Sequence, residues 1–360
     1  MRIAVLATSR HPVAEPYAGG QESHTALLAR GLRELGHHVR MYAPAGSDPG
    51  VADELVPYRG LPDLSAVAAL DPQLPEPDFL RDHAAFTAAV VDLLARPVDV
   101  VHNQSLNFLP LAFSPAVAAP LVTTLHTPPF PWMELGVALA SPRVEYVCVS
   151  RTNAADWSTL PTRPRVIHNG VADDGGGSGA GGEDLVWVGR LTHTKGCDLA
   201  ISAARRAGRR LTIVGPVSER AWFDDVIAPQ LDDRVRYAGH LPHSELAALV
   251  RASAATLVTP RWEEPFGLVA AESATWGTPV IALDRGGLAE FVTPEIGVLV
   301  SARGDADSIV RGLSDGVDAA ASLPREGVRH AALRDLGSER MVHEYASLYR
   351  ELVGSGRGRA

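Results

Sequence analysis

The sequence predicts an α/β protein built from two Rossmann-like domains. Its 360 residues suit two domains of ordinary size. Strand-length apolar runs alternate with helix-forming segments, beginning at residues 2–8 and again at residues 185–189. A glycine-rich run, residues 173–184, lies between these halves and is typical of a flexible, exposed linker. We therefore expect an N-terminal domain over residues 1–172 and a C-terminal domain over residues 185–337.

The first domain opens with a strand, a glycine-containing loop and a helix. Residues 2–8 (RIAVLAT) form an uninterrupted apolar run, as in a strand buried on both faces of a parallel sheet. Gly19 and Gly20 then precede a segment with leucines at helical spacing, and residues 38–43 form the next strand. The loop lacks the G-x-G-x-x-G pattern, so we exclude a dinucleotide-dependent dehydrogenase.

Two later strands of this domain end in polar side chains. Residues 98–102 lead into His102 and Gln104, and residues 121–125 lead into His126. Open α/β sheets bind ligands at the carboxyl ends of their strands, so these side chains are candidates for a binding site. A lone histidine is more often structural than functional, and His102 and Gln104 can equally support the loop.

The second domain carries two charged loops. The string GRLTHTKG places Arg190 and Lys195 between a buried-type strand and a helix, where together they can neutralise a diphosphate. The string EPFGLVAAE places Glu264 just before a helix and Glu272 two turns inside it. At about 1.5 Å per residue, the eight residues between them span roughly 12 Å. That distance is about the reach of a sugar–diphosphate–ribose chain.

The start of this helix is a candidate phosphate site. The backbone N–H groups of Phe266, Gly267 and Leu268 lie where a helix leaves its amides without internal partners. Gly267 lets a ligand approach the backbone closely. Pro265 suits the first turn of the helix, because its fixed φ fits there and its missing N–H costs nothing.

These motifs resemble those of retaining family-4 glycosyltransferases of GT-B fold. EPFGLVAAE followed by GTPVIA resembles their E-x7-E signature, GRLTHTKG resembles G-R-x-x-x-x-K-G, and VIHNGV resembles the P-N-G-V turn at the end of their first domain. The resemblance covers most of the chain and is strongest over residues 166–292. It implies two Rossmann-like domains that face a central cleft. It also implies a terminal helix, about residues 338–353, that packs back onto the first domain.

The resemblance also implies a reaction and roles for the site residues. The protein would be a retaining glycosyltransferase that moves a sugar from a nucleotide-diphospho-sugar to a hydroxyl acceptor, with no metal ion and no other cofactor. Catalytic roles fall to His126, Glu264, Arg190 and Lys195, and donor binding to Gly19, Gly20, Arg190, Lys195, Glu264, Phe266, Gly267, Leu268 and Glu272. His102 and Gln104 are weaker candidates for contacting the acceptor. Asp305-Ala306-Asp307 is formally a metal motif, but its place at a helix start favours a capping role.

Composition narrows the remaining classes. A net charge of -9 and a pI of about 5.8 argue against a nucleic-acid binder driven by phosphate attraction. Two cysteines make neither a disulfide framework nor a zinc cluster. No apolar run has the length of a membrane span and no basic leader precedes the first strand, so we expect a cytoplasmic protein, with peripheral membrane contact left open. The Ala-, Gly- and Arg-rich composition is typical of a high-GC bacterium.

Several alternatives stay open at this point. A nucleotide-sugar 2-epimerase or a phosphorylase-like enzyme of the same fold would also grip phosphates with basic residues. A non-enzymatic sugar-nucleotide binding protein is the least favoured reading. UDP is preferred over GDP, ADP and dTDP because residues 241–244 contain no acid to pair with guanine. The sugar, the acceptor and the oligomeric state are not predicted.

Overall fold

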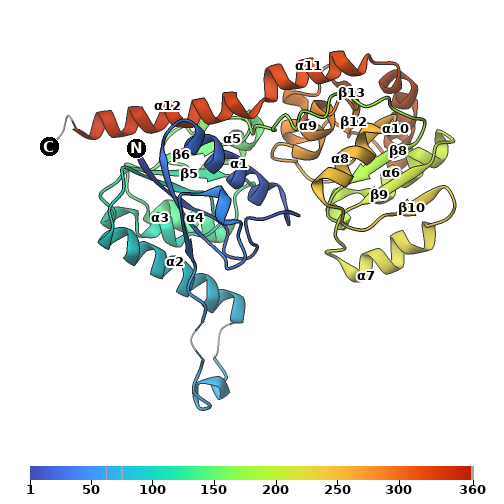
Figure 1. The fold of residues 1–360 in the computed structure, drawn as a ribbon. Coiled ribbons are helices and arrows are strands. Elements are labelled where there is room, and N and C mark those ends of the chain that lie inside the picture. The colour runs from blue at the N-terminus through green and yellow to red at the C-terminus, as the bar shows by residue number, and fades with distance from the viewer. Residues whose placement is uncertain (62, 74–75, 358–360) are drawn as a thin grey trace. The chain divides into compact units, whose positions relative to one another are not determined.

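The structure is a computed structural model that describes residues 1–61, 63–73 and 76–357. Its internal contacts divide the chain into two compact units (Figure 1). Unit 1 comprises residues 1–149, residues 154–167 and the chain from residue 339 onward. Unit 2 comprises residues 150–153 and 168–338, so the glycine-rich run belongs to unit 2.

Unit 1 contains a parallel sheet with the strand order β3-β2-β1-β4-β5-β6-β7. Its described strands are β1 (Arg2–Leu6), β2 (His38–Ala43), β3 (Glu54–Pro57), β4 (Val100–Asn103), β5 (Leu121–Leu125), β6 (Glu145–Cys148) and β7 (Arg165–Val166). Ile3 on β1 pairs with Val39 and Val100, which sets the register at the centre of the sheet. The main helices are α1 (Gly20–Glu34), α2 (Pro77–Ala95), α3 (Leu109–Ala112), α4 (Pro131–Leu139) and α12 (Ser338–Arg357).

Helices cover both faces of this sheet because its central strands are apolar on both sides. On one face Ile3 and Val5 pack with α1 and α12, and on the other Ala4 and Leu6 pack with α2, α3 and α4. Helix α12 brings Tyr345 into the first of these clusters, although it lies far along the chain. None of the helices among the described residues, α12 included, is long and apolar enough to cross a bilayer.

Unit 2 repeats the architecture with a parallel sheet of strand order β10-β9-β8-β11-β12-β13. The strands are β8 (Leu185–Val188), β9 (Leu211–Val214), β10 (Val235–Tyr237), β11 (Ala255–Val258), β12 (Val280–Leu283) and β13 (Gly297–Val300). The helices are α6 (Cys197–Arg206), α7 (Arg220–Trp222), α8 (His243–Arg251), α9 (Leu268–Thr275), α10 (Ala306–Ala321) and α11 (Arg325–Leu336), while α5 (Arg151–Asp156) has residues in both units.

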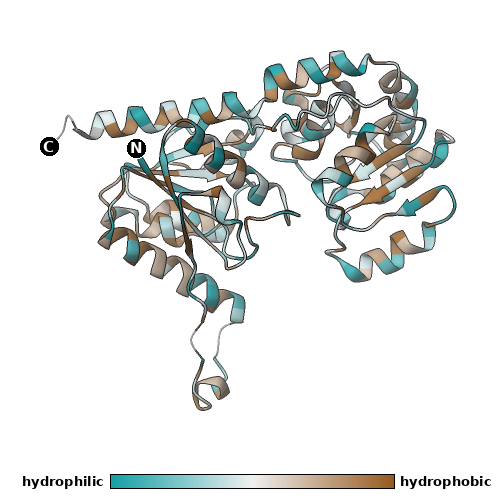
Figure 2. Ribbon diagram, in the orientation of Figure 1, coloured by the Kyte–Doolittle hydropathy of each residue, from teal (hydrophilic) through white to brown (hydrophobic). Residues whose placement is uncertain are grey.

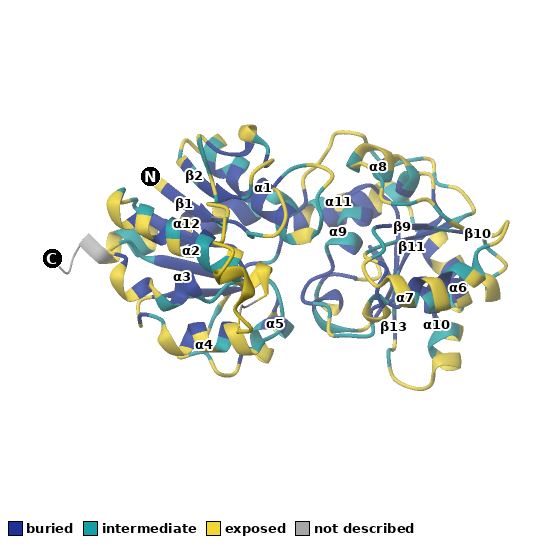
Figure 3. Ribbon diagram, turned by 90° about the horizontal axis from the view of Figure 1, so that it is seen from below, coloured by how far each residue is buried: buried dark blue, intermediate teal, exposed yellow. Residues whose placement is uncertain are grey.

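The central strands of both sheets are largely apolar and buried, whereas the outer helix faces carry polar and exposed residues (Figures 2 and 3). In unit 2, α6 and α10 pack on one face of the sheet, and α8 packs on the other. Each unit is therefore a parallel sheet covered on two sides by helices. The prediction of two Rossmann-like sheets is confirmed.

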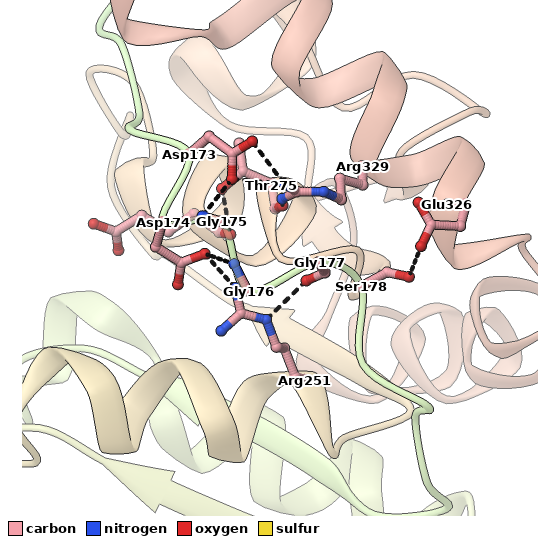
Figure 4. Close-up of polar contacts among 11 residues, drawn as sticks. Asp173, Asp174, Gly175, Gly176, Gly177, Ser178, Arg251, Thr275, Glu326 and Arg329 are labelled. Atoms are coloured by element: carbon pink, nitrogen blue, oxygen red, sulfur yellow. Dashed lines mark hydrogen bonds and ion pairs between the residues drawn. The ribbon is translucent and has the colours of Figure 1, made fainter.

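The glycine-rich run, residues 173–184, contains no buried residue, in line with the predicted exposure, but it is bonded to its surroundings where a flexible linker was predicted. It is bonded to the helices of unit 2 (Figure 4). Arg329 on α11 holds both carboxylate oxygens of Asp173, at 2.6 and 2.7 Å. Arg251 at the end of α8 donates to the carbonyl oxygen of Gly177 at 2.9 Å.

Close approach to neighbouring backbone explains why this run needs glycine. A Cβ atom at Gly179 would lie 2.3 Å from the carbonyl oxygen of Arg251, and one at Gly182 would lie 2.4 Å from that of Ala252. Such distances exclude any side chain. The glycines therefore let residues 173–184 lie against the end of α8, a requirement that composition cannot distinguish from flexibility.

Candidate active site

The two charged loops of unit 2 bring Lys195 and Glu264 together. Lys195 ends the short turn between β8 and α6, and Glu264 lies in the loop between β11 and α9. Their side chains, 23% and 14% exposed, form an ion pair with 2.6 Å between Nζ and Oε2. The indole N–H of Trp262 donates to the same carboxylate oxygen at 2.9 Å, and the Lys195 ammonium lies 5.1 Å from the centre of that ring.

Trp262 is a site residue that the sequence analysis did not find. Its position two residues before Glu264 could have indicated it, because an indole N–H can donate to a carboxylate and the indole ring can attract a cation such as Lys195. Lys195 has a further distinction, because it is the only lysine in the sequence.

Tertiary contacts fix the two loops to each other. Gly196 has a φ of +68°, and a Cβ atom there would lie 2.0 Å from the carbonyl oxygen of Thr259. The Thr259 hydroxyl donates back to the Gly196 carbonyl oxygen at 2.8 Å. Arg261 makes two bonds to the carboxylate of Asp198, at 2.6 and 2.5 Å, which ties the loop before α9 to the first turn of α6. These contacts hold the ammonium and the carboxylate in place.

Helix α9 begins at Leu268, three residues later than the proline rule places it. Gly267 precedes the helix in the left-handed region, with a φ of +99°, so Pro265 lies outside the first turn. Phe266 is buried and stacks on Phe291 with 5.1 Å between ring centres. The backbone N–H groups of Phe266, Gly267 and Leu268 make no hydrogen bond to any described residue. These free N–H groups can bind an anion, and a role in phosphate binding stays a prediction.

A glycine turn after β12 supports the loop that carries the glutamates. The N–H of Gly287 donates to the carbonyl oxygen of Glu264 at 2.8 Å, and a Cβ atom at Gly286 would lie 2.2 Å from that oxygen. The neighbouring Glu263 accepts from the N–H of Gly286 at 2.7 Å and pairs with Arg285 at 3.1 Å. Glu263 thus stabilises the turn, which leaves Glu264 to face Lys195.

Glu272 on α9 has a carboxyl group without a protein partner. No described residue makes a hydrogen bond or ion pair with its carboxyl oxygens, and protein atoms crowd the group although it keeps a partial opening to solvent. This burial raises its pKa from 4.5 to about 7. A shielded carboxyl group with free acceptor oxygens is suited to binding hydroxyl groups of a ligand.

Arg190, like Glu272, is a predicted site residue whose side chain is not bonded to the other site residues that the structure describes. It follows β8 directly and its side chain is exposed. Its guanidinium has no bond to any residue within the described ranges. The position at the carboxyl end of the central strand is that of a ligand-binding group, and a role in phosphate binding stays a prediction.

In unit 1, the predicted residues His126, Gln104 and His102 lie together at the carboxyl ends of β4 and β5. The Nε2 atom of His126 lies 2.5 Å from the side-chain oxygen of Gln104. The side-chain nitrogen of Gln104 lies 3.1 Å from the Nε2 atom of His102. His102 and Gln104 are fully buried, whereas His126 is partly exposed. Burial, helped by the positive charge that His24 would carry, holds the pKa of His126 and of His102 well below the usual histidine range. Both imidazoles are therefore neutral at pH 7.

The remaining predicted residues of unit 1 lie at the start of α1. Gly20 is its first residue and Gly19 its cap, with an extended φ of -168°. One turn further on, the ring of His24 meets the edge of the His126 ring with 4.9 Å between centres. The first turns of α1 thus lie beside His126, while contact of Gly19 and Gly20 with a ligand stays a prediction.

The formal metal motif near the end of unit 2 is a helix cap. The side chain of Asp305 accepts from the N–H of Ser308 at 2.9 Å, at the start of α10, and the capping prediction is confirmed. Among the described residues, no group of three or more His, Cys, Asp or Glu side chains is arranged to hold a metal ion.

Comparison with models of known protein families assigns the chain to a class of enzyme. The model described as Glycosyltransferase Family 4 matches residues 18–174, and the model described as Glycosyl transferases group 1 matches residues 176–320. The chain belongs to this family of glycosyltransferases, and the predicted enzyme class is confirmed.

The names of three similar curated proteins mention different molecules. Glycogen synthase of Mycobacterium tuberculosis strain H37Rv is 30% identical, with 81% of this chain and 80% of that protein covered. D-inositol 3-phosphate glycosyltransferase of Acidothermus cellulolyticus is 31% identical, with 92% and 86% covered. A 2-deoxystreptamine glucosyltransferase of Streptomyces kanamyceticus is 32% identical, with 49% and 48% covered.

Solved structures support the fold. Sucrose-phosphate synthase from Thermosynechococcus elongatus matches with a TM-score of 0.80 at 21% identity, covering 98% of this chain and 99% of that one. HepE of Anabaena, crystallised with UDP and glucose, matches with a TM-score of 0.75 at 17% identity and covers 98% and 100%. The predicted GT-B fold, with two Rossmann-like sheets, is confirmed.

Proposed function

We propose that the protein is a retaining glycosyltransferase that transfers a sugar from a UDP-sugar to a hydroxyl group of an acceptor, without a metal ion. The observation that carries the proposal is the Lys195–Glu264 pair in the loops that end at α6 and α9. The UDP and glucose named for HepE support the choice of nucleotide. The retaining outcome rests on the resemblance of the E-x7-E motif.

The chemistry asks for positive charge where the leaving group forms. Cleavage of the anomeric C–O bond leaves negative charge on the diphosphate, and fixed donors aimed at that charge accelerate the step. Lys195, Arg190 and the N–H groups at the start of α9 are such donors. When a bound diphosphate also contacts the Lys195 ammonium, the ammonium no longer pairs with Glu264 alone. The Glu264 carboxylate can then accept hydrogen bonds from sugar hydroxyls. Glu272 accepts from the ribose hydroxyls and His126 contacts the transferred sugar.

The single lysine allows a direct test of donor binding. An amine-acylating reagent modifies only Lys195 and the N-terminal amine of Met1, and peptide mass spectrometry separates the two sites. UDP is expected to slow acylation of Lys195 and leave that of Met1 unchanged. Equal protection of both amines, or of neither, would refute a diphosphate site at Lys195.

A thermal-shift panel of UDP, GDP, ADP and dTDP in EDTA identifies the nucleotide. A ligand that binds only the folded protein raises the Tm by mass action. We expect UDP to give the largest shift, and Lys195→Met to remove it. The matched control is Arg206→Gln, which removes an exposed cation at the other end of α6. A shift that survives in Lys195→Met, or appears only with added divalent metal, would contradict the proposal.

Product analysis then tests the reaction. The acceptor screen begins with the molecules that the relatives' names mention, namely D-inositol 3-phosphate, 2-deoxystreptamine and glycogen. An NMR coupling constant at the anomeric proton of the product reports retention or inversion. Conversion of the sugar nucleotide without any acceptor would instead identify an epimerase.

A further inference from the structure

A chain of hydrogen bonds in unit 1 joins helix α12 to His126. The hydroxyl of Tyr349 lies 2.5 Å from Nδ1 of His102, whose Nε2 atom lies 3.1 Å from the side-chain nitrogen of Gln104. The other end of that amide, Oε1, lies 2.5 Å from Nε2 of His126. The chain thus connects β4, the segments that follow β4 and β5, and α12, which are far apart in the sequence.

The bond to Gln104 decides which nitrogen of His126 carries the proton. An amide oxygen only accepts hydrogen bonds, so Nε2 of His126 must donate. In the amide orientation of the structure, the nitrogen of Gln104 donates toward the Nε2 atoms of His102 and His24, at 3.1 and 3.4 Å. In a neutral imidazole the second nitrogen, Nδ1, then keeps its lone pair. That atom has no hydrogen bond to any residue the structure describes.

The partners of Gln104 leave its side chain little freedom. Gln104, His102 and Tyr349 are completely buried, and the backbone oxygen of Gln104 accepts from the side chain of Gln21 at 2.5 Å. His102 is also held by the hydroxyl of Thr124, 2.8 Å from its Nε2 atom. A buried polar group that loses one of these partners pays for an unmade hydrogen bond, so the arrangement favours a single geometry.

We propose that Gln104 and Tyr349 are positioning residues that keep the imidazole of His126 in its Nε2–H form, so that Nδ1 is available to accept a hydrogen bond from a substrate hydroxyl. Gln104 fixes the proton directly, and Tyr349 acts through His102. The inference rests on the proposed role of His126 in sugar transfer. It assigns to the buried Gln104 and His102 a supporting function in place of direct contact with the acceptor.

The tautomer is measurable without substrate. In a ¹⁵N-labelled protein, two-dimensional spectra distinguish protonated from unprotonated imidazole nitrogens, and His126→Asn identifies the signals of His126. We expect the protonated nitrogen to be Nε2 in the wild type. In Gln104→Leu, which keeps the size but not the acceptor, a mixture of tautomers is expected. A protonated Nδ1 in the wild type would overturn the inference even if Gln104→Leu failed to fold.

Kinetics test the consequence for transfer. Gln104→Leu is expected to lower kcat by about tenfold, and Tyr349→Phe by less, while the Kd for UDP stays unchanged. The control is Thr123→Val, which removes a buried hydroxyl that has no hydrogen-bond partner among the described residues and lies next to Thr124 on β5. Thr123→Val should leave both the spectrum and kcat as in the wild type.

The two readouts separate this inference from the proposed function. Loss of the Nε2–H form in Gln104→Leu with an unchanged kcat would show that Gln104 sets the tautomer but does not serve transfer, and would refute the inference. An unchanged tautomer with a lowered kcat would refute it as well, because the effect would then come from packing. A protein that shows the expected tautomers but binds no UDP would contradict only the proposed function.

Discussion

Replacing Glu272 with glutamine tests whether burial holds its carboxyl group in the neutral form. The folded-state pKa is about 7, against 4.5 for an unperturbed glutamate, and burial is its cause. Between these pH values the unfolded chain loses its proton while the folded protein keeps it. The contribution of Glu272 to the free energy of unfolding therefore falls as the pH rises from 4.5 to 7, and is level above and below that window.

The size of the effect follows from the shift. Each pKa unit corresponds to about 1.4 kcal/mol, so the wild type is expected to lose up to about 3 kcal/mol across the window through this one group. Glu272→Gln has no proton to lose there. Relative to the wild type, the variant should therefore gain up to about 3 kcal/mol between pH 5 and pH 8.

Urea unfolding at pH 5, 6, 7 and 8 measures the difference. The control is Glu245→Gln, an exposed glutamate in the first turn of α8, which should give the pH dependence of the wild type. A stability difference between Glu272→Gln and wild type that does not vary with pH would refute the assignment. A wild type that becomes more stable relative to the variant as pH rises would reverse the sign and refute the burial argument itself.

Three further outcomes are expected. Lys195→Met should lower kcat/KM for the donor by about 100-fold, measured with the sugar nucleotide that gives the largest thermal shift. Gly196→Ala should cost at least about 3 kcal/mol in urea unfolding and Gly208→Ala only about 1–2 kcal/mol, because both glycines have a φ of +68° but only the first meets a carbonyl oxygen; equal losses would contradict this. Arg251→Met should speed proteolysis and amide exchange within residues 173–184, since it removes the bonds to that segment; unchanged rates would show that other contacts hold it.

The sequence was most informative where one local pattern carries the information. Apolar runs such as residues 2–8 identified buried strands because a strand covered on both faces needs apolar side chains throughout. Glu264 and Lys195 were found because the strings EPFGLVAAE and GRLTHTKG resemble motifs of the family, and the structure brings the two side chains together. Their binding of a sugar-nucleotide donor is a prediction that the acylation and thermal-shift experiments test.

Features that depend on distant partners could not be predicted in this way. Nothing local to Arg261 indicates that its guanidinium binds Asp198, and nothing local to Tyr349 indicates a bond to His102. Both pairs exist only because the sheet and its connections bring separate segments together. The predicted flexibility of residues 173–184 was wrong for a related reason. Glycine occurs both where a chain is flexible and where another backbone comes too close for a side chain, and composition does not distinguish the two.

Helix α12 has a consequence for the order in which the protein can fold during synthesis. The core of unit 1 is closed by Met341, Tyr345 and Tyr349, which are translated only after the whole of unit 2. Unit 2 ends at residue 338 and is complete before them. The unit that is translated first therefore keeps an open hydrophobic face during synthesis, and the nascent chain is expected to depend on a chaperone until helix α12 emerges.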